Sequence, residues 1–344
     1  MSTTSYAVSA KARAKFGKFL SEHDYDGVLA CQSVAEVMVY LKSHTHYGAV
    51  LSGVSDRDVH RGRLEALLRQ FQFKEFDSLC RYDSSVSAGF SRYVVEKAEV
   101  EQIIHFLILF NARSTDRFMF RFPAFLSKRT ELDFNKLANV RDYDGLLGVL
   151  AHTPYYDILK AFEPDEKGRL PVSDIENRLY DLITRHMTAY IDKQTKGSER
   201  RELTDIFEKL TDYSMISRII RLKRYYKLPP DVIKANVLPG RSGLHPALIR
   251  RMCEAESAEE VFAIVQSTKY GRLISKAGAD DQGDIGPRVQ YQIAKKNLHF
   301  SNNPSVVMIS FMFLSETELM NIICLIEGIR YQVDPKTIRS MLIR

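Results

Sequence analysis

The chain contains few of the residues that interrupt helices. Its 344 residues include 17 glycines and 11 prolines. Together these make up about 8% of the chain, whereas average usage is roughly 12%. Glycine loosens a helix and proline breaks its hydrogen-bond pattern, so this scarcity favours long helices with few turns.

Cysteines are also few, and no two of them form a CxxC pair. The four are Cys31, Cys80, Cys253 and Cys324. Zinc sites and disulfide frameworks need cysteines at short or regular spacings. The scatter therefore argues against both and indicates a reducing compartment.

The sequence shows no recognisable leader and no membrane-length apolar run. Residues 1–9 are polar and have no apolar centre, so no signal peptide is visible. The longest apolar runs, residues 103–110 and 306–314, are less than half of the roughly 20 residues that a membrane span needs. We therefore expect a soluble protein.

The common catalytic signatures are missing. The sequence contains no GxxxxGK[ST] phosphate loop, GxGxxG fingerprint, HExxH helix or GxSxG elbow. These motifs place backbone amides, metal ligands or a nucleophile where the chemistry needs them. Their absence predicts that the chain binds neither ATP nor another cofactor, and we name no catalytic residues.

Two segments contain possible metal ligands, and both favour a structural interpretation. His44 and His46 flank Thr45, but the equivalent positions around Thr153 and Thr268 do not keep a histidine pair. The loop of residues 278–287 has three aspartates but lacks the glutamate and the regular alternation of a calcium loop. We interpret the histidines as local variation and the loop as plain surface, and predict no metal site.

What the chain does contain is a pattern that occurs three times. Thr45, Thr153 and Thr268 each precede a tyrosine by two positions, and they lie 108 and 115 residues apart. Apolar residues stand seven and four positions before each threonine and five and six after it, a helical spacing. Upstream of each threonine is a helix-start signal. These signals are Ser33 with Glu36, Asp142, and Ser257 with Glu260.

A second marker follows in the same order, which strengthens the repeat. It is an adjacent isoleucine pair within a helical pattern, at residues 103–104, 219–220 and 322–323. The last two copies then share a closing turn with a tyrosine and a proline, at residues 226–230 and 331–335. The first copy lacks this turn and is degenerate there.

The repeat predicts an all-α fold of three similar helical modules, at residues 1–115, 116–238 and 239–344. The repeated rings of Tyr47, Tyr155 and Tyr270 are interpreted as core residues. Each ring would anchor the end of its helix, with its hydroxyl satisfied at the edge of the core. An active site is normally single and asymmetric, so a threefold pattern indicates architecture.

The clearest charged cluster allows two interpretations. It consists of Arg218, Arg221, Lys223, Arg224 and Lys227, with Tyr225 and Tyr226 among them. Basic and aromatic residues together are typical of a nucleic-acid surface. A solvated helix face whose positive end complements the helix dipole has the same composition, and we favour it because the net charge is only +6.

Several of these features together resemble one family. The residues are Tyr6-Ala-Val-Ser-Ala-Lys-Ala-Arg-Ala14, Asp24-Tyr25, Ser33-x-x-Glu36, Thr45-x-Tyr47, Glu316-x-Glu318-Leu-Met-Asn321-Ile-Ile and Tyr331-x-x-x-Pro335-x-x-Ile338-Arg-x-x-Leu342. They look like the C subunit of prokaryotic V-type (A/V-type) ATPases, the counterpart of the eukaryotic d subunit. The departure is residues 102–111, where a more basic and less apolar helix end is expected.

The resemblance implies a fold, a role and partners. It implies an all-helical funnel of three lobes around a pseudo-threefold axis. It also implies a non-catalytic rotor subunit, peripheral on the cytoplasmic, inner face of the cell membrane. Such a subunit links the central-shaft subunits to the membrane proteolipid ring, for ion transport coupled to ATP hydrolysis or synthesis.

The residues themselves suit such a role and leave two alternatives. Three like lobes joined head to tail can close into a ring, and a rod can enter its hollow. One alternative is a helical nucleic-acid-binding module that uses residues 218–227. The other is a generic helical scaffold with no rotor partner.

Overall fold

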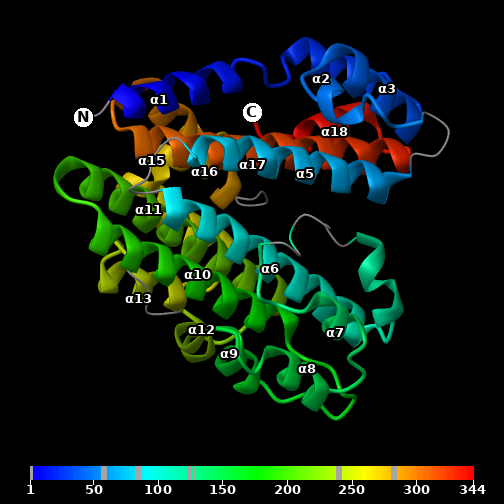
Figure 1. Cartoon of the computed structure of the whole chain (residues 1–344). Coiled ribbons are helices and arrows are strands. Elements are labelled where there is room, and N and C mark those ends of the chain that lie inside the picture. Colours follow the sequence, from blue (N-terminus) through cyan, green and yellow to red (C-terminus); the bar gives the residue numbers. More distant parts are fainter. Residues whose placement is uncertain are drawn as a thin grey trace. The chain divides into compact units, whose positions relative to one another are not determined.

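The computed structural model describes residues 3–55, 60–81, 87–121, 126, 129–237, 242–279 and 285–344. Within these residues every regular element is a helix and no strand occurs (Figure 1), which confirms the predicted all-α class. Most of the aspartate-rich loop and the expected end of the second module fall on residues 280–284 and 238–241. Both segments lie outside the described residues.

Packing divides the chain into two compact units, each made of segments far apart in sequence. Unit 1 comprises Met1–Phe19, Ile191–Cys324 and Val333–Arg344, and unit 2 comprises Leu20–Tyr190 and Leu325–Gln332. The predicted division into residues 1–115, 116–238 and 239–344 rests on sequence similarity, and it stays a prediction. The arrangement of three lobes as a funnel also stays a prediction.

Unit 1 is built around α17 (Pro304–Arg330), of which residues 304–324 belong to this unit. The nine residues from Val306 to Leu314 are all buried, so this segment has no solvent face. The other helical elements of the unit are α1 (Thr3–Phe16), α11 (Gly197–Arg221), η3 (Leu222–Tyr226), α12 (Pro230–Asn236), α13 (Pro246–Glu254), α14 (Ala258–Gln266), α15 (Lys269–Lys276), α16 (Ile285–Phe300) and α18 (Pro335–Met341). Helix α11 packs on α14 and α16.

Helix α17 is the one described helix long and apolar enough to cross a membrane. In its most apolar 18-residue window, 78% of the residues are buried inside the protein. Phe313 contacts Phe207 of α11, and Phe311 contacts Phe19, at ring separations of 6.2 and 5.7 Å. These contacts are typical of the core helix of a globular unit.

Unit 2 has its core along two long helices, α6 (Ser87–Asn111) and the first part of α10 (Val172–Gln194). Ile175, Leu179 and Ile183 form the buried stripe of α10 that the periodicity predicts. The remaining helical elements are α2 (Glu22–Leu29), α3 (Val34–His44), α4 (Gly48–Leu51), α5 (Arg61–Cys80), η1 (Thr115–Arg121), α7 (Phe134–Ala138), α8 (Tyr143–Leu150) and α9 (Tyr156–Lys160).

The predicted helix starts are confirmed at all three positions. Ser33 accepts a hydrogen bond from the Glu36 amide at 3.2 Å, and Ser257 accepts one from the Glu260 amide at 3.1 Å. Asp142 does the same for the Gly145 amide at 2.8 Å. Each side chain satisfies an orphan donor of the first turn, which fixes where α3, α8 and α14 begin.

The three long helices that carry the isoleucine pairs end in the same unusual way. Shortly after α6, α11 with η3, and α17, a non-glycine residue adopts a left-handed conformation, with φ of 53° at Arg113, 49° at Lys227 and 55° at Gln332. At the first end the Ser114 amide donates to the Leu109 carbonyl at 2.9 Å, which closes the last turn. The first copy thus ends like the others, although it lacks their closing sequence.

Candidate functional site

The repeated threonine makes a corner between two helices in each copy. Its hydroxyl donates to a carbonyl of the helix before it, at 2.6 Å for Thr45, 2.8 Å for Thr153 and 2.6 Å for Thr268. The same oxygen accepts from the amide of the tyrosine two residues on, at 3.2 to 3.3 Å. One hydroxyl therefore bridges the end of the first helix and the backbone that leads into the second, which explains the Thr-x-Tyr spacing. In the third copy the threonine is also the N-cap of the second helix, α15. We call these three turns the Thr corners.

The residue after the tyrosine is glycine where the corner is tight. A Cβ on Gly271 would lie 2.4 Å from the Cα of Gln266, and a Cβ on Gly48 would lie 2.5 Å from the carbonyl oxygen of Lys42. Both clashes are with backbone atoms, which cannot turn away. The middle corner has Tyr156 at this position, so a Cβ is accommodated there.

All three corner tyrosines are buried, as the sequence predicts. Their exposed fractions are 3% for Tyr47, 1% for Tyr155 and 5% for Tyr270. Two of them also have buried acidic partners that the sequence analysis did not identify. The signal available in the sequence was an acidic residue on the apolar side of a long helix, which is unusual unless the acid is hydrogen-bonded.

In unit 1 the acidic partner is Asp212 of α11. Tyr270 donates its hydroxyl to this carboxylate at 2.9 Å. The Ser242 hydroxyl and the Gly243 amide also donate to it, at 2.6 and 3.0 Å. Burial and the hydrogen bond to Asp212 raise the pKa of Tyr270, so the ring stays a neutral donor.

In unit 2 the acidic partner is Glu99 of α6. Tyr155 donates to it at 2.5 Å, and the Thr130 hydroxyl makes a further short hydrogen bond to it. A second buried acid, Glu96, lies one turn earlier and accepts from Arg92 at 2.7 Å. Burial raises the pKa of the Glu99 carboxyl, and the charge of Glu96 acts in the same direction.

Neither histidine of the first corner lies in a metal-binding cluster. Among the described residues no group of three or more His, Cys, Asp or Glu side chains could hold a metal ion. His44 lies against the ring of Tyr40, with centroids 4.8 Å apart. His46 lies between Tyr47 and Phe71, at 4.2 and 5.4 Å. These contacts give both rings a packing role.

The basic stretch of residues 218–227 is not one continuous basic face. Lys223 is only 8% exposed, and Arg224 donates to Glu259 at 3.0 Å. Arg221 and Lys227 are exposed, and the rings of Tyr225 and Tyr226 are 69% and 59% exposed. The solvated basic face that the sequence analysis favoured is therefore present only in part.

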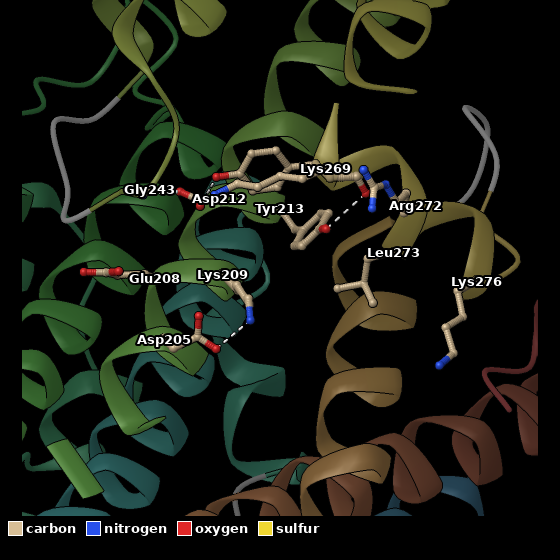
Figure 2. Close-up of a pocket in the computed structure, with 11 residues that line it drawn as sticks. Asp205, Glu208, Lys209, Asp212, Tyr213, Gly243, Lys269, Arg272, Leu273 and Lys276 are labelled. Atoms are coloured by element: carbon tan, nitrogen blue, oxygen red, sulfur yellow. Dashed lines mark hydrogen bonds and ion pairs between the residues drawn. The ribbon is translucent and has the colours of Figure 1, made fainter. Parts of the chain in front are cut away.

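A groove of about 400 Å³ lies between α11 and α15 in unit 1. Asp205, Glu208 and Lys209 come from α11, and Lys269, Arg272 and Lys276 come from α15 (Figure 2). The Tyr270–Asp212 pair lines the inner part of the groove. We call this feature the α11–α15 groove.

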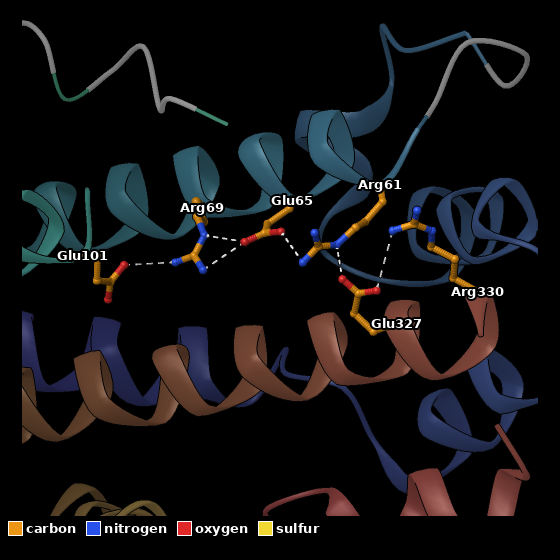
Figure 3. A network of polar contacts seen from close by, with 6 residues as sticks. All are labelled: Arg61, Glu65, Arg69, Glu101, Glu327 and Arg330. Atoms are coloured by element: carbon orange, nitrogen blue, oxygen red, sulfur yellow. Dashed lines mark hydrogen bonds and ion pairs between the residues drawn. The ribbon is translucent and has the colours of Figure 1, made fainter. Parts of the chain in front are cut away.

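Unit 2 contains a chain of ion pairs that joins three helices (Figure 3). Glu65 of α5 binds Arg61 and Arg69 at 3.2 and 3.0 Å, and Arg69 reaches Glu101 of α6 at 3.3 Å. Arg61 also pairs with Glu327, near the end of α17. Charges of opposite sign alternate along the row, so its ion pairs connect the three helices to one another.

The fold and these contacts together define a class of protein. The repeated features are buried corners, shared helix ends and packed tyrosines, which serve architecture. Such a pattern is typical of an all-α protein with internal structural repeats.

The family is shown by comparison with known proteins. The chain belongs to the ATP synthase (C/AC39) subunit family, whose model matches residues 8–341. It is similar to the C subunit of the A-type ATP synthase of Thermococcus kodakarensis, with 24% identity over 283 residues that cover 80% of this chain and 72% of the relative.

Two further relatives carry the same name. The C subunit of the A-type ATP synthase of Pyrococcus abyssi is 21% identical over 345 residues, which cover 97% of this chain and 88% of that protein. The one from Methanosphaera stadtmanae is 23% identical over 269 residues, which cover 78% and 66%. The resemblance to this family that the sequence motifs indicated is thereby confirmed.

Proposed function

We propose that this chain is a non-catalytic rotor subunit of an A/V-type ATPase. It would link the central-shaft subunits of the ATPase head to the proteolipid ring in the membrane. The observation that carries this proposal is the family match over residues 8–341, which includes all three Thr corners. Its relatives are named as subunits of A-type ATP synthases.

The described structure supports a binding role for this subunit. Its repeated side chains are used within the fold: the corner threonines hydrogen-bond to backbone groups of their turns, and the corner tyrosines are buried. Helix α17 is apolar, but 78% of its most apolar window is buried in the protein. We therefore propose a peripheral subunit on the cytoplasmic face of the membrane, held there by its partners.

Mixing the purified chain with the central-shaft subunits tests the proposal. We expect a specific one-to-one complex by size-exclusion chromatography with light scattering. Salt should weaken it only moderately, because a fitted interface depends more on packing than on screened charge. A shaft complex that does not form at micromolar concentrations would contradict the proposal.

The nucleic-acid alternative predicts a different salt response. Binding to arbitrary labelled oligonucleotides should be measurable and should fall steeply with the logarithm of salt concentration, because phosphate contacts release counterions. Arg221→Glu should then reduce it, since Arg221 is an exposed cation of the basic stretch. Tight, steeply salt-dependent oligonucleotide binding without a shaft complex would replace the rotor proposal with this one.

A further inference from the structure

The α11–α15 groove has an unbalanced distribution of charge. Lys269, Arg272 and Lys276 recur at helical spacing on α15, and all three line the groove. Lys269 lies over the ring of Tyr270 at 5.1 Å. Within the described ranges, Arg272 and Lys276 form no ion pair with a carboxylate. Cations three or four residues apart on a helix repel each other weakly, so an anion bound beside this row would relieve that repulsion.

Two of the three acids on the opposite wall already have other partners. Asp205 pairs with Lys209 of its own helix at 2.5 Å. Asp212 is buried and already accepts from Ser242, Gly243 and Tyr270. Figure 2 shows Asp205, Glu208 and Lys209 on the side opposite Arg272 and Lys276. The α15 side of the groove therefore presents positive charge to whatever enters.

The inner surface of the groove is aromatic and aliphatic. The rings of Tyr213 and Tyr270 pack edge to face, with centroids 5.6 Å apart, and Leu273 lies beside them. Both hydroxyls have acceptors, since Tyr213 donates to the Tyr270 carbonyl at 3.1 Å and Tyr270 donates to Asp212. These side chains thus offer ring and methyl surface, which favours a flat apolar group.

The size of the groove favours a small molecule over a protein partner. Its volume of about 400 Å³ lies in the range of small-molecule pockets, roughly 300 to 1,000 Å³. A stable protein partner covers about 800 Å² of a flatter surface.

From these observations we infer that the α11–α15 groove binds a small organic anion. A phosphate or carboxylate group would lie against Arg272 and Lys276, and an apolar ring would pack on Tyr213, Tyr270 and Leu273. The site would hold its anion with side chains, so the search for glycine-rich phosphate loops could not reveal it. The expectation of a chain without small-molecule ligands would then be wrong at this one site.

Phenyl phosphate, benzoate, inorganic phosphate and phenol separate the parts of this inference. In titrations of the full chain at low salt, phenyl phosphate should bind with a Kd of about 1 mM or below. Inorganic phosphate and phenol should each bind at least about fivefold more weakly, because each lacks one half of the ligand. Benzoate reports whether a carboxylate can replace the phosphate. No saturable binding of phenyl phosphate or benzoate up to about 10 mM would overturn the inference.

Charge-matched variants localise the binding. The double variant Arg272→Glu with Lys276→Glu should weaken phenyl phosphate binding by at least about tenfold. The control is Lys295→Glu with Lys296→Glu, which changes the net charge equally on the exposed face of α16 in the same unit. It should bind almost like the wild type. Equal losses in both variants would show nonspecific charge attraction and overturn the inference.

Leu273→Ala tests the apolar half of the proposed site. It should narrow the difference in Kd between phenyl phosphate and inorganic phosphate, because the phenyl ring of the ligand loses a packing partner. An unchanged ratio in a variant that unfolds at the wild-type temperature would contradict the predicted ring contact. None of these titrations involves the shaft subunits, so they can fail or succeed independently of the rotor proposal.

Discussion

The two tyrosine–acid pairs place the same kind of ring beside different carboxylates. In unit 1, Asp212 accepts from a backbone amide as well as from two hydroxyls. In unit 2, Glu99 accepts from two hydroxyls and lies one turn after a second buried acid, Glu96. The difference shows that the repeated Thr corner fixes the position of the tyrosine ring, whereas the acid that accepts its hydrogen bond, and the groups around that acid, can vary.

Removing the rings should have the largest effect and should act on stability. We expect Tyr155→Ala and Tyr270→Ala each to lower the free energy of unfolding by about 3 kcal/mol, as buried aromatic truncations do. Each change also leaves a buried acid with one donor fewer. Urea unfolding measures the loss. Tyr225→Ala is the control, because that ring is 69% exposed and its removal should change stability by less than about 0.5 kcal/mol.

The same variants test whether the rings contact a partner directly. If the loss is one of stability, folded Tyr155→Ala and Tyr270→Ala should still bind the shaft subunits below their melting temperatures. A variant that melts like the wild type but fails to assemble would show that the ring is a partner contact.

Gly271, at the Thr268 corner of unit 1, should be more sensitive to an added methyl group than Gly148, in the helix before the Thr153 corner of unit 2. Gly271→Ala places a Cβ within 2.4 Å of the Gln266 backbone, so we expect a loss of about 2 kcal/mol. The Cβ added by Gly148→Ala meets no atom within 4 Å, so this change should be neutral or slightly stabilising. Thermal melts of both variants make the comparison. Equal melting temperatures would mean that the Thr268 corner accommodates the added methyl group at little cost.

The smallest expected effect is a pH-dependent change in stability on replacing Glu99 of unit 2. The folded state raises the pKa of Glu99 above its ordinary value, so the folded chain binds this proton more tightly than the unfolded chain does. The protonated Glu99 therefore stabilises the folded chain fully below the pKa of this carboxyl in the unfolded chain. This stabilisation is lost as the pH rises through the higher pKa of the folded chain. Glu99→Gln resembles the protonated acid, so its stability relative to the wild type should improve as pH rises, by about 1 kcal/mol.

Unfolding experiments at a series of pH values check this trend. Asp212→Asn gives the contrast at neutral pH, where it should be destabilising because an oxygen that accepts hydrogen bonds is replaced by a donor. A stability offset for Glu99→Gln that is the same at every pH would show that the proton on Glu99 has no part in folding.

Features encoded by neighbouring residues could be predicted from the sequence. The caps at Ser33, Asp142 and Ser257 depend on residues three positions apart, and the structure has all of them. The apolar spacing around the repeated threonines is confirmed most firmly at two positions, seven residues before and six residues after each threonine. At both positions the side chain is fully buried in all three copies. Local hydrogen bonds and helical periodicity carry this information.

Features that depend on distant residues could not be predicted. Tyr155 meets Glu99 across 56 residues, and Tyr270 meets Asp212 across 58. Nothing in the local pattern pairs them, because the contact exists only after the helices have packed. The burial of Lys223 was also missed, since a lysine stem can lie along apolar surface while its spacing still looks like that of a solvated face.

The residues with left-handed backbone after the long helices show how the sequences of the three repeats can diverge while the helix ends stay in place. Arg113, Lys227 and Gln332 differ in chemistry, and none is the glycine that this conformation favours. Each site tolerates a modest local strain, because the surrounding turn determines the backbone more strongly than the residue does. Copies of an ancestral helix could therefore exchange nearly every side chain at this point and still keep the place where the helix stops.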